Sequence, residues 1–438
     1  MMSLKKIKLS FPDPFQIAIS LSLVTFLLTI LITRPVEVST IDYSYQVLKY
    51  WQKGFWELLE FTMQMVLILV LGHALALSPV IDRTLTIIAK RIHSNTSAIL
   101  IVGLSALIAG LLNWGLGLIF GAIFTRKIGE QAVRNNFKLN YPLLGAVAYT
   151  CMLVWHGGFS GSAPLTVAAP DHFLASEIGV ISIDKTLLSP LNITATLLIL
   201  SILPISMWIL SKRKISYEDE PTHYLGSVNI KEETSPSKAF GGVILGTIML
   251  SLALSDLFVQ GGGLATINLN YVNFILFAVG LILHRSFKDY IQAVQEAISG
   301  ATGIIIQFPI YAGIMGIMKY SGLLAMIAGF FIAHSTAESF PILTFFSAAL
   351  INVFVPSGGG QWAIQGPIVI DAAKQLGVNY ERVIMALSYG DQVTNMLQPF
   401  WALPLLALTK IPAKKLLTYT IPLMIVGILI FVLVLWLA

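Results

Sequence analysis

Apolar stretches of about 20 residues recur along nearly the whole chain and are separated by short polar segments. A helix of that length crosses the hydrocarbon layer of a membrane. Stretches that predict a full crossing lie at residues 14–32, 60–79, 143–169, 187–210, 239–258, 268–284, 300–318, 382–408 and 416–437. The hydrophobic pattern therefore predicts an all-α polytopic membrane protein embedded in a lipid bilayer.

Two further apolar stretches, 98–124 and 340–370, are interrupted near their middles. The first break reads Asn113-Trp-Gly-Leu-Gly117, and the second reads Asn352-Val-Phe-Val-Pro-Ser-Gly-Gly-Gly-Gln-Trp362. Backbone that leaves the helical conformation at membrane depth is tolerated only where protein covers it or water reaches it. We interpret both stretches as re-entrant hairpins that enter and leave the membrane on one side.

The distribution of Lys and Arg gives the orientation. With the N-terminus inside, the inner segments hold Lys5, Lys6, Lys8, Arg83, Lys90, Arg91, Arg126, Lys127, Arg134, Lys138, Lys212, Arg213, Lys214, Arg285, Lys288, Lys410, Lys414 and Lys415. The outer segments hold fewer: Arg34, Lys49, Lys53, Lys185, Lys319, Lys374 and Arg382. Short cytoplasmic loops are the basic ones, so we expect the N-terminus in the cytoplasm and the C-terminus outside. The basic N-terminus and the apolar run after it form a first span rather than a cleaved signal peptide, because no small-residue cleavage site follows.

The two halves of the chain repeat. Asn113 and Asn352 are 239 residues apart, as are Asn140-Tyr141 and Asn379-Tyr380. Each half reads span, amphipathic surface helix (43–59; 286–299), span, linking helix, hairpin, broken span, span. An extra span, 239–258, makes the number of crossings between equivalent elements odd, which inverts the second half. We predict a first repeat at 1–211, a polar cytoplasmic linker at 212–238 and a second repeat at 239–438.

Composition narrows the function. The chain is 56% hydrophobic and 11% charged, with a net charge of +5, and its mean hydropathy is +0.81. The basic residues lie in loops, where topology explains them, so we expect no nucleic-acid partner. The glycine run lacks the Lys-Ser/Thr of a phosphate-binding loop, no Cys/His spacing predicts zinc, and Gly157–Gly161 lacks the strand context of a hydrolase elbow. We predict neither an enzyme nor a bound cofactor.

The tip of the second hairpin has the character of an anion site. Its residues are Ser357, Gly358, Gly359, Gly360, Gln361 and Trp362. Consecutive glycines let backbone N–H groups approach a ligand, and the helix that follows points its positive end at the break. The counterpart in the first half is formed by Asn113, Gly115 and Gly117. We predict that both tips bind a carboxylate, although a simple tight turn would also explain the glycines.

Each hairpin is followed by a span that also breaks. Residues 154–164 (Val-Trp-His-Gly-Gly-Phe-Ser-Gly-Ser-Ala-Pro) are too rich in Gly and Ser to stay helical, and span 382–408 loses its helix near Pro399, which has no N–H. Such unwound carbonyls suit Na⁺, whereas a buried acid suits a proton. The predicted polar lining comprises Ser160, Ser162, Asn395 and Gln398 for substrate and His156, Asp391, Thr394 and Asn395 for the coupling ion. Asp391 could instead pair locally, for instance with Arg382, and His156 could be purely structural.

At these residues the chain resembles the short-chain fatty acid transporter family, the bacterial acetoacetate and butyrate uptake carriers. The resemblance rests on Val355-Pro-Ser-Gly-Gly-Gly-Gln-Trp-Ala363, Gln365-Gly-Pro367, Tyr389-Gly-Asp-Gln392, Asn395…Gln398-Pro-Phe-Trp401, Asn113-Trp-Gly and His156-Gly-Gly-Phe-Ser-Gly-Ser162. It implies the wider ion-transporter superfamily, with two hairpins paired with two broken helices, and a possible homodimer.

We therefore expect a secondary transporter of short-chain monocarboxylates in the cell (inner) membrane, coupled to H⁺ or Na⁺. The acyl tail would lie against Trp and aliphatic side chains, with Trp114, Trp155, Trp362 and Trp401 near the breaks. One alternative is a carrier of another organic anion, a dicarboxylate or sugar acid; a second charge would usually need an Arg or Lys, and neither hairpin motif has one. The other alternative is a cation/proton antiporter that depends on Asp391.

Overall fold

The computed structural model describes residues 14–170, 172–225, 239–258 and 269–437, and these residues form helices and connecting loops without a strand. The basic residues of the first 13 positions, the linker residues 226–238 and the start of the predicted span 268–284 lie outside the described residues. Within the described part, seven helical runs are long and apolar enough to cross a membrane, or eight if one bent pair counts as a span. The prediction of an all-α, multi-pass membrane protein is confirmed.

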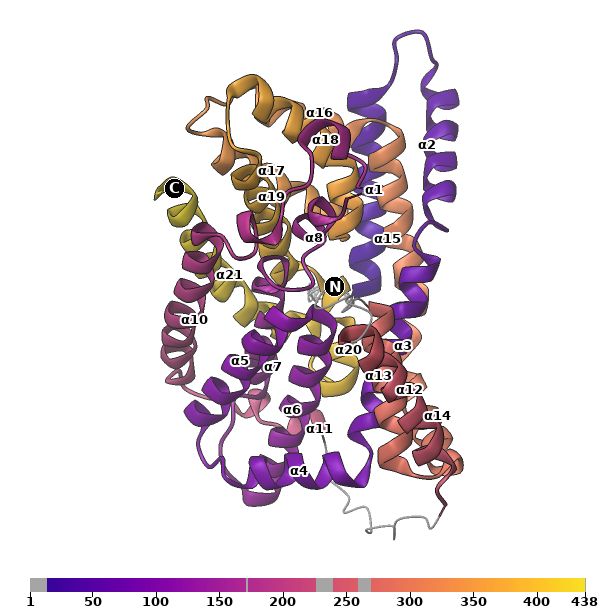
Figure 1. Cartoon of the computed structure of the whole chain (residues 1–438), viewed down its shortest axis with the longest axis vertical. Helices are drawn as coiled ribbons and strands as arrows, with labels where there is room; N and C mark the ends of the chain where they lie inside the picture. Colours follow the sequence, from indigo (N-terminus) through magenta and orange to yellow (C-terminus); the bar gives the residue numbers. More distant parts are fainter. Residues whose placement is uncertain (1–13, 171, 226–238, 259–268, 438) are drawn as a thin grey trace, which may run out of the picture.

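One group of helices fills one side of the molecule (Figure 1). It consists of α1 (Pro14–Thr33), α2 (Thr40–Gly54), α3 (Leu59–Ala76), α12 (Gly241–Phe258), α13 (Leu269–His284), α14 (Phe287–Ile298) and α15 (Thr302–Tyr320). Close backbone contacts hold this group together: a Cβ at Gly54 of α2 would lie 2.5 Å from the Cα of Gly316 in α15. We call it the α3/α15 group.

A second group carries the helix breaks. It consists of α5 (Asn95–Leu112), α6 (Trp114–Asn135), α7 (Tyr141–Ala148), α8 (Ser162–Ala168), α10 (Pro190–Ser211), α17 (Phe340–Phe354), α18 (Gly358–Leu376), α19 (Tyr380–Thr394), α20 (Pro399–Thr409) and α21 (Ala413–Leu437). Helices α4 (Pro79–Lys90) and α16 (Leu323–Ala333) join the two groups, and α9 (Ala175–Ile178) and α11 (Thr222–Leu225) are single turns. We call it the hairpin group.

Both interrupted stretches fold into helical hairpins. In the first, α5 and α6 approach so closely that a Cβ at Gly117 would lie 2.8 Å from the backbone N of Gly110. In the second, the Gln361 side chain of α18 donates to the carbonyl of Ala348 in α17 (3.0 Å). The two hairpins occupy opposite ends of the molecule, the first beside α4 and the second beside α16, and their tips point to its middle (Figure 1).

Both segments expected to be separate surface helices belong instead to longer helical runs. Residues 43–59 fall in α2 and the turn before α3, and α2 and α3 meet at a bend of 45°. Residues 286–299 form α14, which continues into α15 as one run, Phe287–Tyr320. Their apolar faces pack on protein: α2 lies on α15 and α14 lies on α3, with Tyr43 and Tyr290 buried. Amphipathicity alone does not distinguish such packing from a membrane surface.

The beginning of the polar linker is docked onto the hairpin group. The Lys415 side chain at the start of α21 lies 2.9 Å from the Asp219 carboxylate and 3.3 Å from that of Glu218. The Tyr224 ring lies 5.6 Å from the ring of Tyr141 at the start of α7. The part of the linker within the described residues is therefore anchored beside the first broken span.

Candidate functional site

The four helix breaks meet near the middle of the hairpin group. The first broken span leaves the α-helical conformation after α7, continues as 3₁₀ turns at Tyr149–Leu153 and Trp155–Gly157, and resumes at α8. The second is interrupted by one 3₁₀ turn, Asn395–Leu397, before α20. The break that the sequence places near Pro399 thus lies directly before that residue.

The first hairpin tip is joined to the first broken span. The buried Asn113 side chain caps α6 by accepting hydrogen bonds from the N–H groups of Gly115 (2.9 Å) and Leu116 (3.1 Å). The N–H of Trp114 donates to the Ser160 hydroxyl (3.1 Å), and that of Phe159 donates to the Leu111 carbonyl (2.8 Å). Asn113, Gly115 and Ser160 are therefore brought together, with Asn113 and Ser160 already occupied by backbone donors.

The second hairpin tip faces the first broken span. Ser357 caps α18, accepting from the N–H of Gly360 (3.2 Å). A Cβ at Gly358 would lie 2.6 Å from Nε2 of His156 and 2.8 Å from the Trp155 ring, whereas one at Gly359 would meet only the Ser162 hydroxyl, at 4.0 Å. Gly358 is thus in close contact with the break, and Gly359 is exposed. The first turn of α18 lies beside His156 and Ser162.

Asn352 connects the second hairpin to the second broken span. Its Nδ2 lies within hydrogen-bond distance of the Asp391 carbonyl (2.6 Å), the Thr394 hydroxyl (3.0 Å) and Oδ1 of Asn395 (2.8 Å). The Thr394 hydroxyl in turn donates to the Ala349 carbonyl (3.0 Å). These residues are fully or almost fully buried. Thr394 and Asn395 therefore lie together around the side chain of Asn352, which is not among the predicted site residues.

The carbonyls of the second break are held by donors from neighbouring helices. The Tyr149 hydroxyl, from the first broken span, lies 2.9 Å from the carbonyl of Asn395 and 3.2 Å from that of Gln398. The Thr420 hydroxyl of α21 donates to the Met396 carbonyl (2.7 Å). The Gln398 side-chain amide donates to the Asn352 carbonyl. The carbonyls of Asn395, Met396 and Gln398 are therefore already hydrogen-bonded within the protein.

Asp391 and His156 form a buried pair. Nδ1 of His156 lies 3.8 Å from the Asp391 carboxylate and 3.1 Å from the Ser388 carbonyl. We therefore assign a hydrogen to Nδ1 and a lone pair to Nε2. Within the described ranges, neither the Asp391 carboxylate oxygens nor Nε2 of His156 has a hydrogen-bond partner. Arg382, the local partner considered for Asp391, instead donates to the Leu435 carbonyl (2.6 Å).

Gln361 and Trp362 lie away from the open side of the tip. The Gln361 amide donates to the Ala348 carbonyl and to Gln365, inside the hairpin. Trp362 is 1% exposed and packs in an apolar cluster with Ala163, Val369 and Leu387. The structure therefore separates these two side chains from Gly358 and Gly359, which meet the first broken span.

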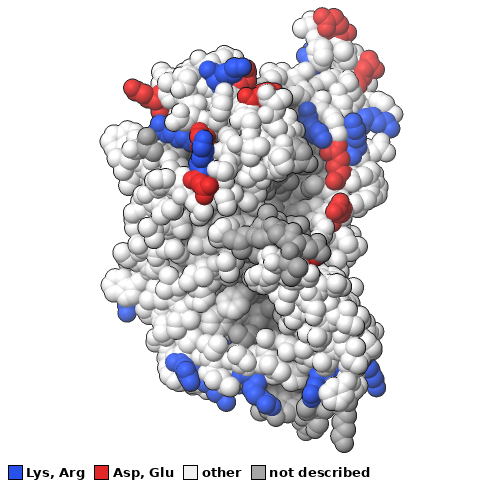
Figure 2. Space-filling view, viewed as in Figure 1, with Lys and Arg blue, Asp and Glu red and all other residues white. Residues whose placement is uncertain are grey.

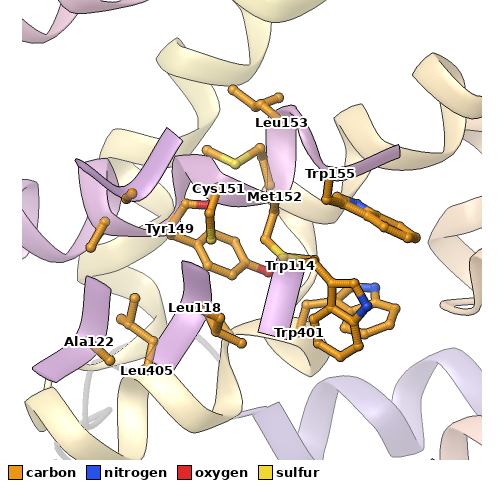
Figure 3. Packing of buried hydrophobic residues seen from close by; sticks show 14 of the residues in the cluster. Trp114, Leu118, Ala122, Tyr149, Cys151, Met152, Leu153, Trp155, Trp401 and Leu405 are labelled. Atoms are coloured by element: carbon orange, nitrogen blue, oxygen red, sulfur yellow. The ribbon is translucent and has the colours of Figure 1, made fainter. Parts of the chain in front are cut away.

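Three tryptophans gather where both broken spans meet the first hairpin tip (Figure 3). The Trp114 and Trp401 rings are 5.0 Å apart at their centroids, and the Trp155 ring lies 6.3 Å and 6.4 Å from them. All three are buried. Because Trp155 also contacts Gly358, this tryptophan triad directly adjoins the first turn of α18.

Several residues of the site escaped the sequence analysis. Asn192 of α10 donates to the Gly157 carbonyl (2.8 Å) and accepts from the Tyr389 hydroxyl (3.0 Å), and the Gln392 side chain accepts from the His156 N–H (2.9 Å). A cavity lined by these residues leaves room for about one water molecule. Gln392 stands beside Asp391 in the recognised motif, but Asn192 lies at the start of an ordinary span with no sequence signal.

Comparisons with known proteins identify the family of this chain. The sequence profile of the short chain fatty acid transporter family matches residues 2–438. A protein of Escherichia coli (strain K12), named as a candidate short-chain fatty acid transporter, is 36% identical over 96% of this chain and 95% of its own length. A protein of Haemophilus influenzae with the same description is 37% identical over 95% of this chain and 96% of its own length.

Two solved transporter structures also align with the chain. The YdaH transporter of Alcanivorax borkumensis aligns over 97% of this chain and 98% of its own at a TM-score of 0.42 and 15% identity. MtrF of Neisseria gonorrhoeae, described as illuminating a class of antimetabolite efflux pumps, aligns over 98% and 95% at 0.46 and 14%. The family profile and the two curated relatives together show that this chain belongs to the short-chain fatty acid transporter family and is not an enzyme.

Proposed function

We propose that this protein is a secondary active carrier that moves short-chain monocarboxylates, such as butyrate or acetoacetate, inward together with a proton. The observation that carries the proposal is the first turn of α18, which lies against the unpaired Nε2 of His156 and next to the tryptophan triad. A polar end for the carboxylate and an apolar end for the tail therefore adjoin one another.

The carboxylate binds at the polar end. The first N–H groups of a helix have no partner inside the helix, and the dipole favours an anion there. Ser357 engages the N–H of Gly360, which leaves those of Gly358 and Gly359 for a ligand. Glycine at 358 is needed because a larger residue would collide with His156 and Trp155. Gln361 and Trp362 support the hairpin from behind.

The acyl tail lies on the tryptophan triad. Burying each CH₂ group is worth about 0.8 kcal/mol, so a tail of two or three carbons gains modest affinity from such a surface. The sequence of both hairpin tips contains no Arg or Lys that would pair with a second carboxylate. These features favour a monocarboxylate over a dicarboxylate or a sugar acid.

A proton is favoured over Na⁺ as the coupling ion. The main-chain oxygens of the second break accept hydrogen bonds from Tyr149 and Thr420, whereas His156 and Asp391 offer adjacent buried sites for a proton. A proton on Nε2 of His156 creates a donor that faces the carboxylate site, and Asp391 stabilises the resulting imidazolium. Substrate and proton then bind as a neutral pair, which lowers the cost of burying either charge.

We also propose that the carrier lies in the cytoplasmic membrane with its N-terminus inside and its C-terminus outside, and that it forms a homodimer. In Figure 2 the end of the molecule at α4 shows Lys and Arg, and the opposite end shows both signs. This asymmetry supports the orientation. Hairpins at opposite ends are what inverted repeats with re-entrant hairpins would produce.

The test is uptake of labelled butyrate into proteoliposomes under an imposed pH gradient, with and without Na⁺. We expect uptake to follow the inward proton gradient, and Asp391→Asn and His156→Gln to abolish the gradient-driven part. Succinate should not compete. Uptake driven by Na⁺ at uniform pH would contradict proton coupling. Na⁺/H⁺ exchange without any uptake or binding of organic anions would instead identify an antiporter.

A further inference from the structure

The tryptophan triad continues into the neighbouring helix group. Phe61 of α3 lies 5.8 Å from Trp401 and 6.3 Å from Trp114, measured between ring centroids. Behind it, Phe308 of α15 stacks on Phe61 at 5.9 Å and on Phe400 at 3.9 Å. One side of the aromatic cluster therefore belongs to the α3/α15 group, while the tryptophans belong to the hairpin group.

The order of these contacts defines a direction. Gly358, at the anion end, touches Trp155; Trp155 neighbours Trp114 and Trp401; and these two neighbour Phe61. A carboxylate at the first turn of α18 with its tail over the triad points its last carbon at Phe61. Helix α15 runs beside this series of contacts. Its Met315 sulfur would lie 3.3 Å from a Cβ at Gly360, at the anion end, and its Phe308 stacks on Phe61 at the other end.

Phe61 differs from its neighbours in exposure. Trp114, Trp155, Trp401, Phe308 and Phe400 are buried, whereas Phe61 is partly exposed and packs on the core from its edge. A ring in this position is less tightly enclosed than the buried rings, so a change in its size disturbs the surrounding packing less than a change in those rings.

We propose that Phe61 is the specificity-determining residue for acyl chain length: its ring forms the end wall of the tail site and excludes longer acids. The inference rests on the proposed function. An apolar pocket discriminates between ligands that differ by one methylene by about 10-fold or more, and removal of the wall relieves that discrimination for longer tails. A larger side chain at this position extends the discrimination to shorter acyl tails.

The experiment measures competition by acetate, butyrate, hexanoate and octanoate against labelled butyrate uptake in proteoliposomes. Phe61→Ala is expected to raise the apparent affinity for hexanoate relative to butyrate by about 10-fold or more. Phe61→Trp is expected to lower the apparent affinity for butyrate relative to that for acetate by a similar factor. Phe61→Leu keeps an apolar side chain of intermediate size and should fall between wild type and Phe61→Ala.

The matched control is Phe274→Ala, which removes a ring of α13, 37% exposed and in the same helix group, and should leave the length profile unchanged. Thermal unfolding of each purified variant checks that it is folded. If the folded variants Phe61→Ala, Phe61→Leu and Phe61→Trp take up butyrate with an unchanged chain-length profile, Phe61 is not the end wall of the tail site. The proposed carrier function is unaffected by that result. Folded wild-type protein that neither binds nor transports any of the acids overturns both.

Discussion

Asn113 and Asn352 are 239 residues apart and each lies near the turn of a hairpin, Asn113 between α5 and α6 and Asn352 in the last turn of α17, yet their side chains have different roles. Asn113 caps its own hairpin helix, accepting from Gly115 and Leu116. Asn352 donates across to the second broken span, toward Asp391, Thr394 and Asn395. In the second hairpin Ser357 caps the helix, so the Asn352 side chain is available to bond to another helix.

The two halves of the sequence contribute different residues to the place where the helix breaks meet. The first half contributes Trp114 and Trp155 to the aromatic cluster, together with His156. The second half contributes the glycine-rich helix start and a polar network that fixes Asp391 next to His156. Both halves therefore supply aromatic and polar residues, since Trp401 of the second half joins the tryptophan triad and His156 of the first half pairs with Asp391.

The largest expected effect is at the second asparagine. Asn352→Ala removes a buried donor shared by three acceptors, and we expect a loss of about 2–3 kcal/mol in the free energy of unfolding together with loss of uptake. Asn113→Ala removes a helix cap and should cost about 1 kcal/mol. Denaturant unfolding of the two purified variants measures the comparison. If Asn113→Ala lowers the free energy of unfolding as much as Asn352→Ala or more, the proposed difference between the two asparagines is wrong.

The next effect separates two adjacent glycines at the second tip. Gly358→Ala places a methyl group 2.6 Å from Nε2 of His156, which displaces the helix start from the break. We expect butyrate uptake to fall about 100-fold, as a misplacement of about 1 Å can cause. Gly359→Ala meets no such neighbour and is the matched control. Equal losses in both variants would show that backbone freedom, not the contact with His156, is what the tip requires.

A smaller effect is expected at the hydroxyl that joins the two broken spans. Tyr149→Phe removes the donor to the carbonyls of Asn395 and Gln398 and keeps the ring. It should lower stability by about 1 kcal/mol without changing which acids compete for uptake. Thr420→Val, which removes the donor to the Met396 carbonyl, is the comparison from outside the first half. If Tyr149→Phe switches coupling from H⁺ to Na⁺, the assignment of a proton is refuted.

The smallest effect lies outside both tips, at the docked linker. Burial raises the pKa of Asp219, but hydrogen bonds from Ser216 and Lys415 and the charge of Lys415 lower it more, so that it lies below the usual value. A carboxyl group with a lowered folded pKa stabilises the fold above its unfolded pKa, and this contribution is lost as the pH falls through the folded pKa.

Asp219→Asn should therefore cost about 0.5 kcal/mol at pH 7 and nothing at a pH below the folded pKa. Thermal unfolding at both pH values measures the difference, with Glu220→Gln as the control in the same turn. A cost that persists at the acid pH would mean that the linker is held by packing of Tyr224 on Tyr141, not by charge.

Much of the fold could be predicted from the sequence. The lengths of the apolar stretches, the glycines and prolines at the breaks, and the two hairpins all follow from local physics, because a helix needs apolar length to cross a membrane and cannot continue through such backbone. Amphipathic patterns were less informative: α2 and α14 have such faces but pack on α15 and α3. A periodic pattern indicates which face is buried and says nothing of the partner.

The sequence by itself determined that this chain is a multi-pass membrane protein with two pairs of helix breaks, and its motifs identified the family. Only the tertiary structure decided which break faces which: Gly358 lies against His156 and Trp155 of the other half, and Tyr149 holds carbonyls 246 and 249 positions away. It also decided that Asn352 is a donor to a neighbouring helix and Asn113 a cap. A hydrogen bond depends on distance and direction between two groups, and those are set by packing rather than by the residue types at either end.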